Sequence, residues 1–267
     1  MAKVLAPLPD RDFDVTEIAV PWKKLTAAGH QVVFATEKGG SAPACDPLLL
    51  TGVIFGQLGA DAEPKAFYHE MEQSPEFRSP VAWNSVQATD FGGLLLTGGH
   101  AQGMRQYLES KTLQETVAAF WTLKRPVGAI CHGTIVLART IDPATGKSVL
   151  ADMGTTCLRQ YMEMAAYYMT AWKRGKYYRT YDQTVEQEVR SVLYNPAAQF
   201  IGGPFALTSK GTDKDDSNAF VCQDRHYVSA RWPGDAYLYA KTFRRMLPKP
   251  FKPEAAEKTL KGKRQQS

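Results

Sequence analysis

A cysteine followed by a histidine closes an apolar run, and this pair is the clearest sign of chemistry in the sequence. Cys131 follows residues 127–130, and small and apolar residues continue after His132 and Gly133. The pattern indicates a buried strand that turns sharply into a helix, with the cysteine at the turn. The first N–H groups of that helix favour an anion, so we expect a nucleophilic thiol with a depressed pKa.

A pair of glycines ends another apolar run and could assist such a thiol. Gly98 and Gly99 follow residues 93–97. Because glycine lacks a Cβ, the N–H groups of this turn can come close to a substrate oxygen, and with the amide of His132 they form a predicted oxyanion hole. The next residue, His100, could contact substrate or could pack against a neighbouring segment.

Strands alternating with helices are expected to position these groups. The expected strands cover residues 3–7, 31–36, 93–97, 127–130, 147–151, 205–208, 219–222 and 226–231. The expected helices cover residues 16–28, 113–123, 158–173, 185–193 and 235–247. This order predicts an α/β fold with a doubly wound, mostly parallel sheet sandwiched by helices. The ligand site should then lie at the carboxyl ends of the strands, where Glu17, Gly98 and Cys131 are expected.

The composition is that of an ordinary globular protein. Of the 267 residues, 44% are hydrophobic and 22% are charged, and we find neither a membrane span nor a secretory leader in the sequence, so we expect a cytoplasmic protein. The net charge of +5 comes mostly from residues 249–267, which hold six Lys or Arg and two Glu. We interpret this stretch as a basic, flexible tail and expect no nucleic-acid partner.

The remaining chain is expected to be one domain, residues 1–248, with cap insertions at about 38–90 and 155–204. Its four cysteines include no close pair, which argues against a disulfide scaffold or a zinc knuckle. The histidines are dispersed along the sequence, and no phosphate-binding loop is visible. We therefore expect no metal site and no cofactor.

Three segments together resemble a known family. They are EIAVP at residues 17–21, LLTGGHA at residues 95–101 and AICHG at residues 129–133. The combination resembles the ThiJ/PfpI superfamily, within the flavodoxin-like, class I glutamine amidotransferase-like fold, and covers roughly residues 3–247. The long insertions are similar to the branch that contains heat-shock chaperones with cofactor-free glyoxalase activity.

The resemblance implies partners for the thiol. It makes Glu17 the acid that meets the Cys131 sulfur, either donating a hydrogen bond to the thiolate or acting as a base on a bound carbonyl compound. From spacing alone, Glu17 could instead be a helix N-terminal acid. His132 would be the dyad partner, and Glu163, with Asp152 as second choice, the acid that orients it. Glu163 could equally be a solvated helix acid.

The activity that the resemblance implies is a glyoxalase III-like conversion of methylglyoxal to lactate, with a small carbonyl compound as substrate and Cys131 as nucleophile. One alternative is a cysteine amidase or peptidase with a Cys131-His132-Glu163 triad. Its glutaminase form is weakened because His226 lacks the His-x-Glu pattern of amidotransferases. Another alternative is a holdase chaperone or redox sensor that uses the same thiol. Relatives commonly pair, so we expect a homodimer.

Overall fold

The computed structural model describes residues 1–248 and contains nine strands. The strands are β1 Lys3–Pro7, β2 Arg11–Phe13, β3 Gln31–Thr36, β4 Ala44–Cys45, β5 Val81–Ala82, β6 Gly93–Leu96, β7 Val127–Ile130, β8 Val221–Asp224 and β9 Tyr227–Ala230. Seven of them form one sheet in the order β5-β3-β1-β6-β7-β9-β8, in which only the β8–β9 pair is antiparallel. The parallel pair β2–β4 stands apart from this sheet.

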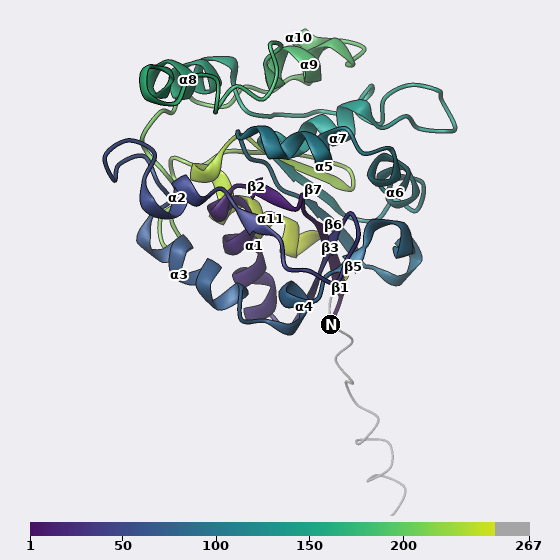
Figure 1. Ribbon diagram of the computed structural model, residues 1–267. Helices are drawn as coiled ribbons and strands as arrows, with labels where there is room; N and C mark the ends of the chain where they lie inside the picture. The colour runs from purple at the N-terminus through teal and green to yellow at the C-terminus, as the bar shows by residue number, and fades with distance from the viewer. Residues whose placement is uncertain (249–267) are drawn as a thin grey trace, which may run out of the picture.

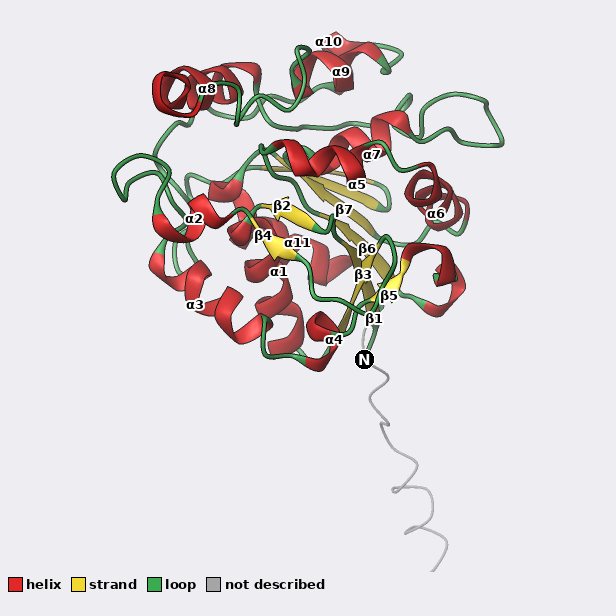
Figure 2. Cartoon of the chain, in the orientation of Figure 1, coloured by secondary structure: helices red, strands yellow, loops and turns green. Residues whose placement is uncertain are grey.

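Helices cover both faces of the sheet (Figure 1). They are α1 Val15–Ala27, α2 Pro47–Thr51, α3 Ala62–Met71, α4 Pro75–Arg78, α5 Arg105–Leu108, α6 Lys111–Thr122, α7 Gly133–Arg139, α8 Gln160–Arg174, α9 Val185–Ser191, α10 Pro196–Gln199 and α11 Ala236–Met246. Helices α1 and α11 pack on one face, with α3 against α1, and α5, α6 and α7 pack on the other. Helices α8, α9 and α10 form an outer layer beyond α7, which α9 contacts (Figure 2).

The central strands are buried along nearly their whole length. Every residue of β6, β7 and β9 is buried, and in β1 only Lys3 is exposed. A parallel sheet covered by helices on both faces requires such continuous apolar strands, because neither face meets water. The predicted fold, a mostly parallel sheet sandwiched by helices, is confirmed.

Three strand predictions need correction. Residues 147–151 form turns, with a single bridge between Ile141 and Ser148. Residues 205–208 are irregular, and Phe205 is exposed. The strand expected at 219–222 begins at Val221 and continues to Asp224. Apolar residues favour a strand only where a neighbouring strand supplies backbone hydrogen bonds, and periodicity does not reveal that neighbour.

The two predicted insertions contain six of the helices, including the three of the outer layer. Residues 38–90 include α2, α3 and α4, and residues 155–204 include α8, α9 and α10. No helix within residues 1–248 is long and apolar enough to cross a membrane. The predicted basic tail, residues 249–267, lies outside the described residues.

Candidate active site

Cys131 lies at a sharp turn between β7 and α7. Its φ of 56° falls in the left-handed region, which is unusual for a residue with a Cβ and is typical of a nucleophile elbow. Helix α7 begins immediately afterwards at Gly133, where a Cβ would come 2.5 Å from the Leu96 carbonyl oxygen of β6. The glycine therefore lets α7 approach the sheet closely, and the predicted strand–turn–helix is present.

Glu17 and Gly98 meet beside this elbow because β6 lies between β1 and β7. The Gly98 N–H donates a hydrogen bond of 2.8 Å to Glu17 Oε2. A Cβ on Gly98 would lie 2.7 Å from that oxygen and 2.8 Å from the Cys131 Cβ, so only glycine fits. The oxyanion-hole prediction is therefore wrong for Gly98, whose N–H binds Glu17.

Asp14 holds Glu17 in place from the start of α1. Its side chain accepts hydrogen bonds from Thr16 N at 2.8 Å and from Glu17 N at 3.1 Å, as an N-cap does. The Asp14 N–H in turn donates to the Gly98 carbonyl at 2.9 Å. The start of α1 and the turn after β6 are thus tied together. Sequence reasoning missed Asp14, although an Asp three residues before a Glu is a helix-start signal.

The His132 ring also lies beside the sulfur. Its Nδ1 is 3.5 Å from Cys131 Sγ, and its Nε2 is 3.3 Å from Thr180 Oγ1. The Thr180 hydroxyl donates its only proton to the His100 carbonyl at 2.6 Å, so it must accept from His132 Nε2–H. Burial lowers the pKa of His132 well below its usual value. The ring is therefore neutral, and the Nδ1 lone pair points at the thiol.

His100 also reaches the sulfur. Its Nε2 lies 3.9 Å from Cys131 Sγ, and its ring centroid is 4.8 Å from that of His132. Burial lowers the pKa of His100 to about 4, so this ring is neutral as well. The structure thus brings His100 to the reactive atom and also places it against Tyr178, with ring centroids 6.2 Å apart.

Residues 177–181, which we term the strap, run across this histidine pair. Besides the bonds of Thr180, the Arg105 side chain donates to the Thr180 carbonyl at 2.8 Å. The Tyr177 and Tyr178 hydroxyls donate to the two oxygens of the buried Asp46 at 3.1 and 2.8 Å. Cys131 has no exposed surface, so a substrate reaches the sulfur only after neighbouring residues move, and we expect the strap to be the segment that moves.

The electrostatics differ from the predicted depressed thiol pKa. Burial, followed by the nearby Glu17 and Asp14 carboxyls, raises the pKa of Cys131 well above its usual value. Burial and Asp14 likewise raise the pKa of Glu17, and burial raises that of Asp14 to about 6. In this closed state desolvation and negative neighbours outweigh the N-terminus of the short helix α7. Burial and these neighbouring carboxyls therefore favour the protonated forms of the Cys131 thiol and of Glu17.

The structure does not place either predicted acid beside His132. Glu163 is buried, but its Oε1 binds Arg179 Nη1 at 3.1 Å and its Oε2 accepts from Val185 N at 2.9 Å. Asp152 pairs with Arg225 at 2.9 Å. The group that orients His132 is Thr180, which sequence reasoning missed because it stands in no motif.

The family is shown by comparison with known sequences. The model of the ThiJ/PfpI family-like proteins matches residues 8–204. This chain belongs to that family. The match includes the start of α1, the Gly98–Gly99 turn and the Cys131 elbow.

Relatives of this ThiJ/PfpI-like chain include an uncharacterized protein of Schizosaccharomyces pombe, 28% identical over 250 residues, covering 92% of this chain and 84% of the relative. General stress protein 18 of Bacillus subtilis is 29% identical over 159 residues, covering 57% and 76%. Among solved structures, glyoxalase III from Candida albicans has a TM-score of 0.67 at 19% identity, covering 92% and 97%. Drosophila melanogaster DJ-1beta has a TM-score of 0.51 at 17% identity, covering 97% and 96%. The two structural likenesses show a shared fold.

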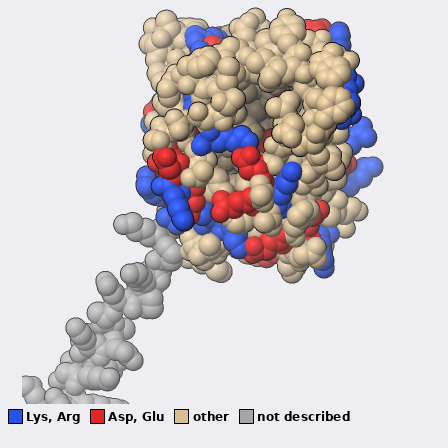
Figure 3. All heavy atoms as spheres, turned by 90° about the vertical axis from the view of Figure 1, so that its left-hand side faces the viewer, with Lys and Arg blue, Asp and Glu red and all other residues tan. Residues whose placement is uncertain are grey.

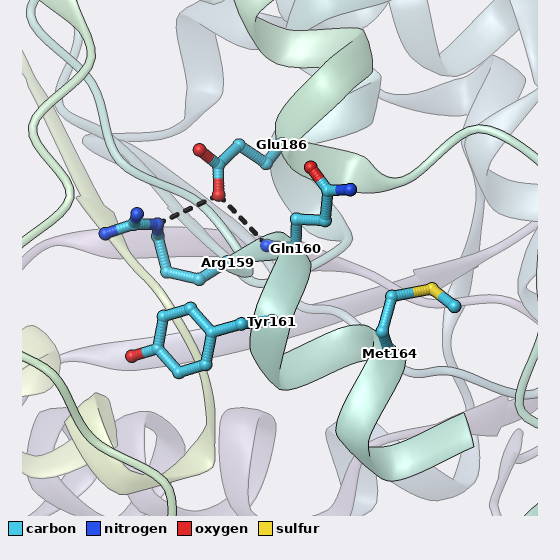
Figure 4. A pocket seen from close by; sticks show the side chains of 5 residues that line it. All are labelled: Arg159, Gln160, Tyr161, Met164 and Glu186. Carbon is cyan, nitrogen blue, oxygen red and sulfur yellow. Dashed lines mark hydrogen bonds and ion pairs between the residues drawn. The ribbon is translucent and has the colours of Figure 1, made fainter. Parts of the chain in front are cut away.

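One surface hollow of the ThiJ/PfpI-like chain lies away from the elbow. It measures about 420 Å³ and is lined by Arg159, Gln160, Tyr161, Met164 and Glu186 at the start of α8 (Figure 4). The Arg159–Glu186 ion pair of 2.9 Å lies across it, and Gln160 N donates to the same carboxylate oxygen. These bonds join α8 to α9, and we assign the hollow no chemistry.

The surface near α2 and α8 is rich in exposed rings. Phe55 and Trp172 are exposed, and their ring centroids lie 6.1 Å apart. Lys173 Nζ lies 3.7 Å from the Phe55 ring centroid. Figure 3 views this side of the molecule and shows most of its charged side chains in the lower half. The aromatic residues of the insertion at residues 155–204 therefore form two groups: Tyr177 and Tyr178 bond to the buried Asp46, and Trp172 faces solvent.

Proposed function

We propose that this protein is a cofactor-independent cysteine enzyme that converts small 2-oxoaldehydes into 2-hydroxy acids, as methylglyoxal into lactate. The observation that carries the proposal is that His132 Nδ1 lies 3.5 Å from the Cys131 sulfur, while Gly98 holds the Glu17 carboxyl beside the same residue. Burial raises the pKa of Glu17 and lowers that of His132. The reaction needs one nucleophile and two groups that exchange protons with it. The fold shared with a glyoxalase III supports the proposal.

In the first step the Cys131 sulfur bonds to the aldehyde carbon. The thiol proton passes to His132 Nδ1, 3.5 Å away, and the aldehyde oxygen takes the proton of Glu17. Glu17, now ionised, removes the hydrogen on that carbon. A carboxylate whose pKa is raised is the stronger base for this step.

Glu17 then returns the proton to the neighbouring carbon while the hydroxyl proton shifts between the two oxygens, which leaves a thioester of the 2-hydroxy acid on Cys131. Water adds to the thioester, the thiolate leaves with the proton of His132, and Glu17 takes the proton from water. The N–H groups of Gly99 and His132 are the candidates to bind the developing oxyanion. One aldehyde and one water give one 2-hydroxy acid, and every group regains its starting proton.

The amidase alternative needs an acid beside His132. Both oxygens of Glu163 are bound elsewhere, to Arg179 and Val185, so the geometry favours the aldehyde reaction. The chaperone and redox-sensor alternatives stay predictions.

The test is lactate formation from methylglyoxal by purified protein, measured enzymatically beside the Cys131→Ser variant. Cys157→Ser is the matched control, because Cys157 is also fully buried but its thiol bonds the Leu158 carbonyl and lies outside the Cys131 site. We expect Cys131→Ser to lose at least about a thousandfold in kcat, and the control to keep its rate. Equal activity of wild type and Cys131→Ser would disprove the mechanism.

A further inference from the structure

The sulfur and two imidazole nitrogens around Cys131 have the spacing of a metal-ligand set. Cys131 Sγ, His132 Nδ1 and His100 Nε2 all lie within 4.8 Å of one another, with the two sulfur–nitrogen distances at 3.5 and 3.9 Å. In a tetrahedral zinc site, bonds of about 2.3 Å to sulfur and about 2.0 Å to nitrogen place these atoms roughly 3.5 Å apart. Small side-chain shifts therefore suffice to hold an ion. The sequence-based reasoning that the histidines are too dispersed is wrong for His100 and His132.

The surroundings orient one of the donors, His132, as a metal ligand is oriented. His132 gives its Nε2–H to Thr180, so Nδ1 presents a lone pair toward the sulfur. Thr180 is itself fixed by its bond to the His100 carbonyl. An outer hydrogen bond of this kind sets the tautomer and direction of a ligating histidine.

The His100 ring has no other polar role within residues 1–248. Its Nδ1 is buried without a hydrogen-bond partner, and its Nε2 approaches only the Cys131 sulfur. A neutral imidazole that carries its proton on Nδ1 has a lone pair on Nε2. In His100 that lone pair faces the Cys131 sulfur and is available to bind an ion.

We propose that His100, Cys131 and His132 form a Zn²⁺ site, in which the ion bonds to the sulfur and displaces the thiol proton into solvent. Thiolate and neutral imidazole are the ligands that Zn²⁺ prefers. A cysteine binds Zn²⁺ as a thiolate, so each bound ion releases the proton of the Cys131 thiol. Binding blocks the sulfur, so Zn²⁺ is expected to inhibit any chemistry of this thiol reversibly.

The test is calorimetric titration of reduced, metal-free, full-length protein with Zn²⁺, in two buffers of different ionisation enthalpy that report proton release. We expect one ion and one proton per chain. Titration with Co²⁺ should add a thiolate-to-cobalt charge-transfer absorption, which identifies sulfur as a ligand. None of these measurements uses an aldehyde, so their failure is distinguishable from failure of the proposed function.

Variants assign the ligands. Cys131→Ser should abolish the charge-transfer absorption, and His100→Gln should weaken Zn²⁺ binding at least about tenfold. Cys157→Ser, a buried cysteine outside the cluster, should bind like wild type, and thermal unfolding checks that each variant is folded. Absence of stoichiometric binding, or unchanged binding and absorption in Cys131→Ser or His100→Gln, would overturn the proposal.

Discussion

The two sides of Cys131 are built from different parts of the molecule. Glu17 belongs to α1, which packs on the sheet and on α11. Its carboxyl is bound by Gly98 of the turn after β6 and lies close enough to Cys131 to raise the pKa of the thiol. His132 is oriented by Thr180, which belongs to the strap outside the sheet. The position of Glu17, on the acid side, therefore depends on the central core. The orientation of His132, on the imidazole side, depends on the strap, which we expect to move when substrate enters. Substitutions on the two sides should act differently.

The largest effect is expected on the acid side. Glu17→Gln keeps an oxygen for the Gly98 N–H but cannot move a proton, so we expect kcat for methylglyoxal to fall about 10²–10⁴-fold. Steady-state lactate formation measures it, with thermal unfolding as the check on folding. A rate near that of wild type would show that the imidazole side alone handles the protons.

A smaller effect is expected on the imidazole side. Thr180→Val removes the acceptor of His132 Nε2–H, and the loss of one buried hydrogen bond should lower kcat roughly tenfold. Thr170→Val is the matched control, because Thr170 is also buried but bonds carbonyls within its own helix, α8. If both variants behave alike, the Thr180 bond does not orient the ring.

The third prediction concerns pH. Asp14→Asn keeps the cap on α1 but removes a negative charge that raises the pKa values of Glu17 and Cys131. Both pKa values should fall, and the alkaline rise of Cys131 alkylation by iodoacetamide should move to lower pH. An unchanged profile would show that the Asp14 charge does not raise the pKa of the Cys131 thiol.

The same variant tests a stability effect whose sign follows from the Asp14 pKa of about 6. The unfolded carboxyl releases its proton near pH 4, so between about pH 4 and 6 the folded state binds more protons than the unfolded state. The contribution of Asp14 to the free energy of unfolding therefore falls as pH rises through this window. Asp14→Asn should remove that decline, as measured by urea unfolding at several pH values.

The smallest effect is expected at Glu163. Glu163→Gln should leave kcat within about twofold, because both carboxylate oxygens bind groups other than His132. The assay used for Glu17→Gln applies, and the two variants form a matched pair of buried acids. A hundredfold loss of kcat in Glu163→Gln would support the Cys131-His132-Glu163 triad and would contradict the difference between the two sides of Cys131.

The elbow and the diglycine turn were predictable because each leaves a local pattern. An apolar strand, a cysteine and a glycine-started helix are neighbours in sequence, and the resemblance added Glu17. Thr180 was not predictable, since it stands 48 residues after His132 and its role depends on a hydroxyl reaching two histidines. A long-range contact made by a single polar side chain produces no periodic pattern in the amino-acid sequence.

The electrostatic prediction failed for a related reason. A helix N-terminus can be recognised in sequence, but the complete burial of Cys131 and the approach of Asp14 and Glu17 depend on packing. The strand expected at residues 147–151 failed because Val149 and Leu150 are buried in turns. The homodimer and the division into one domain with two insertions stay predictions.

The strap is expected to make the reaction rate of the Cys131 thiol depend on the fraction of time during which the strap is open. Cys131 has no exposed surface, and residues 177–181 lie across the histidines beside it, so we expect a reagent to wait until this segment detaches from Asp46 and Arg105. Where reclosing is faster than reaction, the observed rate is the intrinsic rate multiplied by the open fraction. The reactions of oxidants and adventitious electrophiles with Cys131 are then all slowed by this open fraction. A compound that binds preferentially to the open state increases the fraction and reacts faster.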